Sequence, residues 1–184
     1  DMFNWTLYNL HYKGELKEAK KNYTIILKPG DYKFNNSQLA KNNENIKPLH
    51  PSHRLLYETI MRLNPQSVFE MGCGTGMHMS NLQTLLPKAR ICGVDLSSQQ
   101  LNGLKKTYPQ IANNTKQADA TTSWTKLPFE VCDVAFTQAV IMHIHTGDAH
   151  LTALENLFKM ARKYVILYES MKNHHFLDDI KKLH

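Results

Sequence analysis

A short segment near the middle of the chain combines an apolar run, three closely spaced glycines and a helix-like pattern. It reads SVFEMGCGTGMHMSNL, with glycines at Gly72, Gly74 and Gly76. Glycine adopts backbone conformations that side chains forbid, and a strand-to-helix turn built from it lets the backbone approach a ligand closely. We therefore expect a buried strand that turns sharply into a helix and holds a small ligand at the turn.

Strand-like and helix-like patterns alternate from residue 51 onward. Helical spacing covers 51–65, 78–87, 97–109, 148–162 and 173–184. Short apolar strands are expected over 67–71, 90–97, 115–121, 131–140 and 163–170. Such alternation predicts an α/β fold, a Rossmann-like doubly wound parallel sheet with helices on both faces. Ligands of such sheets bind outside the carboxyl ends of the strands.

The first 48 residues are rich in Asn, Lys and Tyr and have a weak apolar pattern. We expect one or two short helices broken at Gly14, then a hairpin over 22–34 that turns at 29–31, then a polar loop over 35–48. Residues 1–48 are predicted to be an accessory region or lid, and 49–184 the core. The first core helix is expected to start with Ser52 as its N-cap and to end at Pro65.

Composition narrows the classes of protein. The 184 residues suit one domain, and no apolar run is long enough to span a bilayer. The net charge of +6 is spread over separate clusters, which predicts solvated helix faces and makes nucleic acid the less favoured partner. Cys73, Cys92 and Cys132 lie in or beside apolar runs, which predicts buried reduced thiols and a cytoplasmic protein.

The glycine spacing separates two cofactor classes. Dinucleotide sites need G-x-G-x-x-G, which would place the third glycine at position 77, where this chain has Met77. Glu70 lies two residues before the first glycine. A carboxylate there is unfavourable beside a pyrophosphate and favourable beside an ammonium group. S-adenosylmethionine carries an α-amino group and a sulfonium, and it has no phosphate.

Four segments resemble, in order and spacing, the motifs of class I S-adenosylmethionine-dependent methyltransferases: VFEMGCGTG, GVDLS, QADAT and DVAFTQAVIMHI. The resemblance covers residues 51–170 and implies S-adenosylmethionine as cofactor and S-adenosylhomocysteine as product. The family sheet ends in an antiparallel hairpin, and only 14 residues follow Ser170. We therefore expect that hairpin to be missing and the chain to be truncated at its C-terminus.

The resemblance also implies a set of cofactor-binding residues: Glu70, Gly72, Cys73, Gly74, Gly76, Asp95, Leu96, Asp119, Ala120, Thr137 and Gln138. In the family, the residues at these positions meet the amino end (Glu70), the two ribose hydroxyls (Asp95) and the adenine amino group (Asp119). Simpler roles stay open at this point. Asp95 could cap the next helix, Asp119 could be a turn acid, and Gln138 could serve packing or face solvent.

The segment TQAVIMHIHTGDAH would face the transferred methyl group. His143 is the candidate base for a hydroxyl nucleophile, with a scaffold role as an equal alternative. His145 is expected to be structural, and His53 is a second candidate on the substrate side. No carboxylate flanks His143, so we expect no metal site.

The class of methyl acceptor is narrowed mainly by sequence motifs that the chain does not contain. The segment after the fourth strand has no N/D-P-P-Y/F motif, and the chain has no Pro-Cys dipeptide. We expect methyl transfer to a hydroxyl or amino group of a small molecule. Resemblance of 137–169 to bacterial methyltransferases encoded beside surface-polysaccharide and nonulosonic-acid genes points to a sugar-linked acceptor. An RNA or protein methyltransferase and a non-catalytic S-adenosylmethionine-binding module are the alternatives, and the oligomeric state is open.

Overall fold

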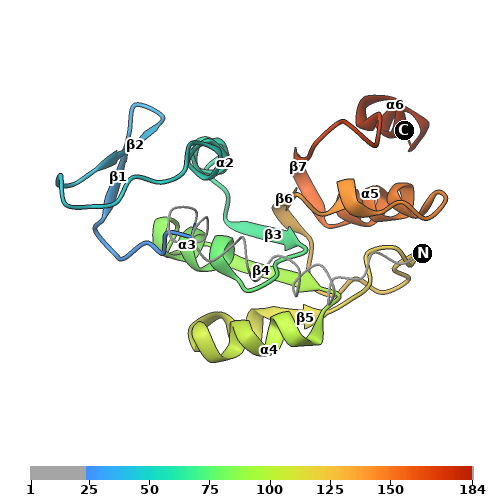
Figure 1. Cartoon of the computed structure of the whole chain (residues 1–184), viewed down its shortest axis with the longest axis horizontal. Helices are drawn as coiled ribbons and strands as arrows, with labels where there is room; N and C mark the ends of the chain where they lie inside the picture. Colours follow the sequence, from blue (N-terminus) through green and yellow to red (C-terminus); the bar gives the residue numbers. More distant parts are fainter. Residues whose placement is uncertain (1–23, 184) are drawn as a thin grey trace.

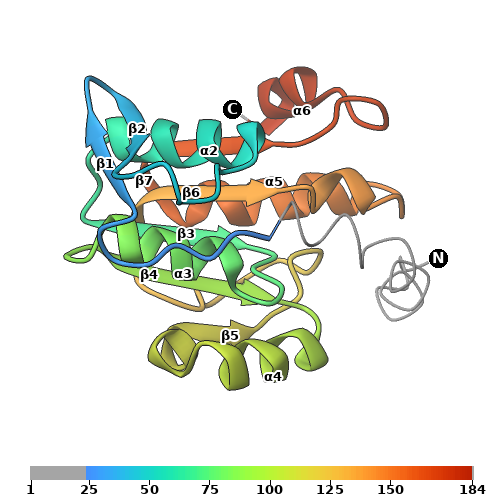
Figure 2. The same cartoon turned by 60° about the vertical axis from the view of Figure 1, so that its left-hand side comes forward.

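Five parallel strands form the central sheet of the computed structural model, which describes residues 24–183. The strands are β3 (Ser67–Met71), β4 (Arg90–Asp95), β5 (Thr115–Gln117), β6 (Cys132–Gln138) and β7 (Ala161–Tyr168). Their order is β5-β4-β3-β6-β7, which Figure 2 shows as a stack that runs from α4 to α6. Because the chain moves outward from β3 to β5 and then crosses to β6, the order reverses between β3 and β6. Ligands of open α/β sheets bind at such a reversal.

Helices cover both faces of this sheet (Figure 1). On one face lie α2 (Pro51–Arg62), α3 (Met77–Leu85) and α4 (Ser98–Thr107), and on the other lie α5 (Ala149–Lys159) and α6 (Phe176–Leu183). Two short 3-10 helices, η1 (Pro109–Asn114) and η2 (Ile141–His143), follow α4 and β6 in the chain. The expected α/β doubly wound architecture is confirmed.

The β3 strand shows why the sheet forms the core. All five of its residues are buried, because neighbouring strands flank it and helices cover both faces. Val68 packs in the cluster with α2, α3 and α4, while Phe69 and Met71 pack in the cluster with α5 and α6. This period-two alternation places Glu70 on the same side as Val68, directly before the glycine turn.

The N-terminal hairpin forms later in the chain than predicted. Its strands are β1 (Tyr32–Asn35) and β2 (Gln38–Lys41), so the prediction of a hairpin over 22–34 and a loop over 35–48 is wrong. Asn36 and Ser37 adopt φ of 48° and 63°, the left-handed values that a two-residue hairpin turn requires. The turn near residue 30 exists, but it joins no paired strands. The helices expected around Gly14 lie outside the described residues.

The start of α2 also differs from the prediction. Its N-cap is His50, whose Nδ1 accepts from the Ser52 N–H at 3.3 Å, so Ser52 lies inside the helix. Pro51 occupies the first turn, where a missing N–H costs nothing. The helix ends at Arg62, three residues before Pro65.

Two further expectations can be compared with the described residues. The three cysteines are buried and free of disulfides, as predicted. Within residues 24–183, no helix is long and apolar enough to cross a membrane.

Candidate functional site

A cavity opens at the carboxyl ends of β3, β4 and β6, next to the reversal of strand order. Its wall consists of residues from the glycine turn, the two strand-end acids with their neighbours and the segment after β6: Met71, Gly72, Gly74, Val94, Asp95, Leu96, Ser97, Gln100, Ala118, Asp119, Ala120, Thr121, Gln138, Ala139 and Val140. None of these is a lysine, arginine or histidine. Most of the cofactor-binding residues expected from the sequence are therefore gathered at one place.

The glycine turn has separate reasons for its glycines. Gly72, Gly74 and Gly76 all adopt positive φ, at 76°, 51° and 82°. A Cβ on Gly72 would lie 2.3 Å from the Val140 Cγ2, whereas one on Gly74 would meet nothing within 4 Å. Gly72 is thus required for close packing and conformation, and Gly74 for conformation alone.

The Asp95 carboxylate connects the glycine turn to the start of α4. Its Oδ2 accepts from the Gly74 N–H at 2.7 Å, and its Oδ1 accepts from the Ser97 N–H at 2.8 Å. The N-cap of α4 is Ser97, whose Oγ accepts from the Gln100 N–H. Burial raises the pKa of Asp95, and these backbone hydrogen bonds oppose the rise. Asp95 therefore organises local structure and also lines the cavity, beside the exposed side chain of Leu96.

Asp119 repeats the local geometry of Asp95 after β5. Its Oδ1 accepts from both the N–H and the hydroxyl of Thr121, at 2.8 and 2.6 Å. The Asp119 carbonyl accepts from the Trp124 indole at 2.9 Å, and Asn156 donates to the Ala120 carbonyl at 2.9 Å. This turn is thereby held at the cavity wall with Ala120 in it.

Glu70 differs from both aspartates. It is 2% exposed, and its Oε2 is buried without a hydrogen-bond partner among residues 24–183. Burial raises its pKa well above the usual range, and the charge of Asp95 adds to the rise. A buried acceptor without a donor costs free energy, so this position is suited to a ligand that brings a cation or donor.

Four of the expected residues lie outside the cavity wall: Glu70, Cys73, Gly76 and Thr137. Cys73 is buried against Gly93. A Cβ added to Gly93 would lie 3.0 Å from the Cβ of Cys73. Thr137 donates its hydroxyl to Glu169 at 3.0 Å.

Glu169, which follows β7, was not singled out from the sequence. Its carboxylate accepts from the N–H groups of Val140, Ile141 and Met142 at 3.0–3.3 Å. Burial raises its pKa, and these hydrogen bonds oppose the rise. Glu169 thus holds the turn that carries Ala139, whose φ is 54°. Its sequence signal is weak: a single acid at the end of the last strand.

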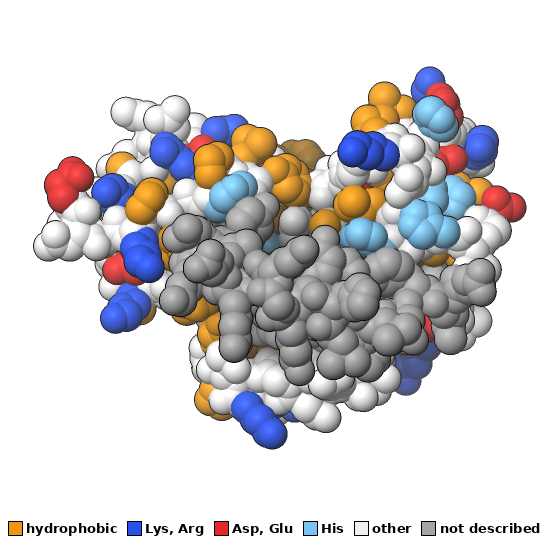
Figure 3. Space-filling model, in the orientation of Figure 1, with side chains coloured by type: hydrophobic (Ala, Val, Ile, Leu, Met, Phe, Trp, Pro, Cys, Tyr) orange, Lys and Arg blue, Asp and Glu red, His pale blue; other side chains and the backbone are white. Residues whose placement is uncertain are grey.

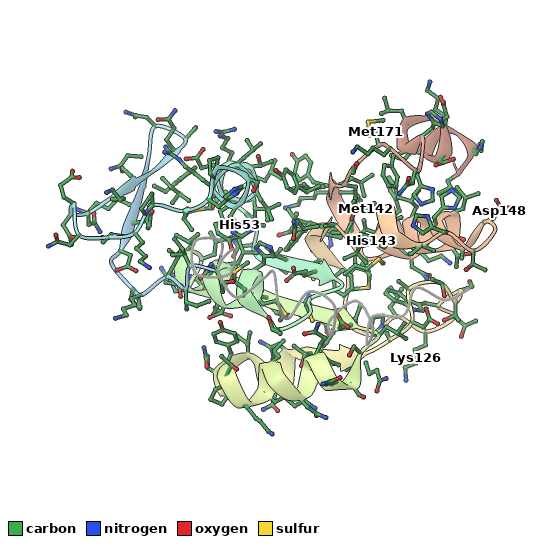
Figure 4. All side chains as sticks on the ribbon, viewed as in Figure 1. His53, Lys126, Met142, His143, Asp148 and Met171 are labelled. Carbon is green, nitrogen blue, oxygen red and sulfur yellow. The ribbon has the colours of Figure 1, made fainter. Side chains whose placement is uncertain are left out.

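The two candidate histidines lie on opposite sides of a surface notch. Figure 3 shows this notch between the part formed by β1, β2 and α2 and the part formed by β7, α5 and α6. Figure 4 places His53 on the α2 side and His143 beyond β6. The pKa of His53 is lowered to about 4, and that of His143 is lowered, in both cases mainly by burial and then by a neighbouring histidine. Neither residue lines the cavity.

Within residues 24–183, no three His, Cys, Asp or Glu side chains are grouped so that they could hold a metal ion. The cavity can, however, accommodate a zwitterionic organic ligand. Glu70 suits an ammonium group, the space around Gly74 is open for a ligand, and Asp95 and Asp119 offer carboxylate acceptors to hydroxyl or amino groups. These residues fit the S-adenosylmethionine expected from the sequence.

Comparisons with known proteins agree with this architecture. Residues 68–163 match the family model described as "Methyltransferase domain". A trans-aconitate 2-methyltransferase from Azoarcus sp. (strain BH72) is 31% identical over 96 residues, which cover 52% of this chain and 35% of that protein. The chain thus spans about a third of the length of this curated relative.

Solved structures share the fold at low sequence identity. Streptomyces venezuelae DesVI superposes with a TM-score of 0.55 at 15% identity, over 65% of this chain and 50% of that one. CalS10, an amino pentose methyltransferase from Micromonospora echinaspora solved with S-adenosylmethionine bound, superposes with a TM-score of 0.54 at 16% identity, over 66% and 50% of the two chains. Because the family model covers more than half of the chain and the cavity lies at the expected edge of the sheet, this chain belongs to the methyltransferase domain family.

Proposed function

We propose that the protein transfers a methyl group from S-adenosylmethionine to a hydroxyl or amino group of a small, polar, sugar-linked molecule. The observation that carries the proposal is the cavity at the strand-order reversal, where the wall combines Gly72, Asp95, Asp119 and Gln138. Such a wall places carboxylate acceptors beside the glycine turn, and none of its residues within 24–183 is a cation that could bind a phosphate.

In this proposal each group of cavity residues binds a different part of the cofactor. Asp95 accepts hydrogen bonds from the ribose hydroxyls, Leu96 contacts the adenine, and Asp119 with the Ala120 N–H meets the adenine edge. Gly72 and Gly74 pass beside the methionine tail, and Glu70 acts on its ammonium group. When bound, S-adenosylmethionine supplies an activated methyl group on a sulfonium.

Support for a small acceptor comes from relatives and from the surface. One relative is a trans-aconitate 2-methyltransferase, and one structural neighbour is an amino pentose methyltransferase. The notch between α2 and β7 lies on the same side of the molecule as His53 and His143 (Figures 3 and 4). A hydroxyl or amino nucleophile held there would be placed and desolvated for in-line displacement.

His143 is proposed as the group that accepts the nucleophile's proton. Burial lowers its pKa, so the imidazole is neutral and basic at neutral pH. Its backbone N–H donates to the Val140 carbonyl at 3.0 Å, which ties it to the turn beside the cavity. Activity should therefore fall only at acidic pH, where the imidazole protonates.

The test begins with binding and continues with turnover. Calorimetry should show that S-adenosylhomocysteine binds and that NAD binds more weakly. A panel of amino- and hydroxyl-bearing sugar nucleotides, with an RNA pool and peptides as alternative acceptors, is then screened for release of S-adenosylhomocysteine from S-adenosylmethionine. Tighter binding of NAD would contradict the cofactor. Cofactor binding without turnover on any acceptor would favour the non-catalytic module.

His143→Ala then tests the base. Turnover should fall by roughly 10²–10⁴, as is typical for a positioned acid–base group, while cofactor affinity and melting temperature stay unchanged. A scaffold role predicts the opposite pattern, in which melting temperature and cofactor affinity fall together. His145→Ala serves as the neighbouring control, and it should leave turnover near the wild-type rate.

A further inference from the structure

A chain of hydrogen-bonded polar side chains leads from the segment around Ile25 and Leu27 to the end of β6, and all its members but the half-buried Gln138 are buried. It consists of Asn81 and His78 on α3, Tyr57 on α2 and Gln138 at the end of β6. The Asn81 Nδ2 lies 3.0 Å from the Tyr57 hydroxyl, which lies 2.8 Å from the His78 Nδ1. The His78 Nε2 lies 3.2 Å from the Gln138 Oε1. Gln138 is the one member of the chain that lines the cavity.

The direction of these hydrogen bonds begins with backbone groups that cannot exchange roles. The Leu27 N–H donates to the Asn81 Oδ1 at 2.9 Å, and the Ile25 carbonyl accepts from the Asn81 Nδ2 at 2.8 Å. These two contacts determine which end of the Asn81 amide is oxygen and which is nitrogen. The second N–H of Asn81 therefore donates to the Tyr57 oxygen.

The Tyr57 hydroxyl must then donate its hydrogen bond to His78. Because the Tyr57 oxygen already accepts from Asn81, its O–H donates to the His78 Nδ1. Burial lowers the pKa of His78 to about 4, so the ring carries a single proton at neutral pH. That proton is on Nε2, which donates to the Gln138 Oε1.

The Gln138 amide is thereby oriented as well. With its oxygen engaged by His78, its NH₂ group remains for a ligand in the cavity. Gln138 directly follows Thr137, which pairs with Met71 beside the glycine turn, so this donor lies at the same end of the cavity as Glu70. Among residues 24–183, no lysine, arginine or histidine lines the wall, and the Val140 N–H is engaged by Glu169.

We propose that Gln138, oriented by Asn81, Tyr57 and His78, donates its amide N–H to the carboxylate of the bound methionine tail. This inference rests on the proposed function. The ammonium and the carboxylate of an α-amino acid share one carbon atom, so a donor for the carboxylate must lie close to the acid that meets the ammonium. Gln138 satisfies that condition on the neighbouring strand. Gln138 is thus a binding residue, and Tyr57, His78 and Asn81 are positioning residues.

The first test replaces the donor without changing its shape. In Gln138→Glu the side chain still accepts from His78 but presents a carboxylate to the ligand. Its affinity for S-adenosylhomocysteine should fall by roughly 10- to 100-fold, the range for losing a hydrogen bond to a charged group. Affinity for 5′-methylthioadenosine, which lacks the amino-acid tail, should stay unchanged. Gln99→Glu, on the exposed face of α4, is the control for added charge.

The second test reads the direction of the chain itself. Long-range ¹H–¹⁵N correlation, assigned with a His78→Phe variant, should show the proton of His78 on Nε2. Tyr57→Phe removes the donor to Nδ1 and should allow both tautomers, with a selective loss of S-adenosylhomocysteine affinity. Tyr108→Phe removes a hydroxyl outside this chain and should change neither readout.

The outcomes separate this inference from the proposed function. If the wild type binds neither ligand, the proposed function fails, while the tautomer of His78 still reports on the chain of hydrogen bonds. If the wild type binds S-adenosylhomocysteine and Gln138→Glu binds it equally well, the assignment of Gln138 is overturned. A proton on Nδ1 of His78 in the wild type would overturn the orientation of Gln138.

Discussion

The two ends of the cavity are built in different ways. At the β4–β5 end, Asp95 and Asp119 each accept from a backbone N–H two residues further on, at Ser97 and Thr121. At the β3–β6 end, Glu70 has a buried oxygen without a partner, and the turn after β6 is held by Glu169 from the end of another strand. The first end is completed by local turn chemistry, and the second depends on residues far apart in sequence.

This difference predicts which groups serve the folded state and which would serve a ligand. Asp95 contributes to the folded state whether or not the cavity is filled, because its hydrogen bonds go to Gly74 and Ser97. Glu70 is a cost to the empty protein, because a buried carboxyl group without a donor is less favourable than one in water. We expect substitutions at the β4–β5 end to lower stability and binding together. Substitution of Glu70 should instead raise stability while it lowers binding.

The largest effect is expected for Gly72→Ala at the β3–β6 end. Its Cβ would collide with Val140 at a φ of 76°, so overpacking costs about 1–3 kcal/mol and the left-handed conformation about 1–2 kcal/mol more. Cofactor binding should be abolished as the turn shifts. Thermal unfolding and calorimetry measure both effects.

Two matched glycines sharpen this result. Gly74→Ala carries only the conformational cost, because its Cβ would meet nothing within 4 Å. Gly103→Ala, in open space on α4, should raise stability by about 0.5–1 kcal/mol through helix propensity. If Gly72→Ala and Gly74→Ala prove equally stable, the close approach of Gly72 to Val140 is not what requires glycine there.

Asp95→Ala should show the coupled behaviour of the β4–β5 end. Binding of S-adenosylhomocysteine should weaken by about 1.5–3 kcal/mol, the range for hydrogen bonds to a charged group. The melting temperature should also fall, because the Gly74 and Ser97 N–H groups lose their acceptor. A variant that loses affinity at unchanged melting temperature would show that Asp95 serves the ligand alone.

Glu169→Gln should have a smaller effect on stability, about 1–2 kcal/mol, because the amide keeps one acceptor oxygen for the turn after β6. Hydrogen exchange at Val140, Ile141 and Met142 should accelerate, since these N–H groups share the carboxylate. Glu155→Gln, on the exposed side of α5, provides the control. Unchanged exchange in this turn would contradict the role assigned to Glu169.

The smallest effect, and one of opposite sign, is expected for Glu70→Gln in the ligand-free protein. The folded-state pKa of Glu70 is raised above its unfolded value, so its contribution is fully present below about pH 4.5 and is lost as pH rises through the folded pKa. Glu70→Gln should therefore gain melting temperature over the wild type at pH 8 and less at pH 5. Its affinity for S-adenosylhomocysteine should nevertheless fall.

The proposed difference between the two ends of the cavity would be contradicted if this pH dependence were missing. A constant difference in melting temperature between Glu70→Gln and the wild type, from pH 5 to pH 8, would mean that the Glu70 carboxyl is not held in its protonated form. Glu44→Gln, whose carboxylate is on the surface beside Lys41, is the control for removal of a charge.

Sequence reasoning was most accurate where local rules apply. The strands around Val68, Ile91 and Val134 were predicted from short apolar runs, and the glycine turn from its spacing. It was wrong for the N-terminal hairpin, because Asn36 and Ser37 form a turn that competes with the more conspicuous proline–glycine turn nearby. Within the described part of the chain, the extended residues near Ile25 pair with no strand, and Asn81 holds them instead.

The sequence by itself determined the parallel sheet and the cavity edge, because apolar periodicity and turns are interactions between near neighbours in the chain. The pair of aspartates was implied by the resemblance of their segments to methyltransferase motifs. Only the tertiary structure decided that Glu70 lacks a partner, that Glu169 holds the turn after β6, and that Gln138 is oriented through His78. The contact between His78 and Gln138 joins residues 60 positions apart, and that between Glu169 and Val140 joins residues 29 apart. Burial and hydrogen-bond direction at such distances arise from packing of the whole fold, which no local pattern encodes.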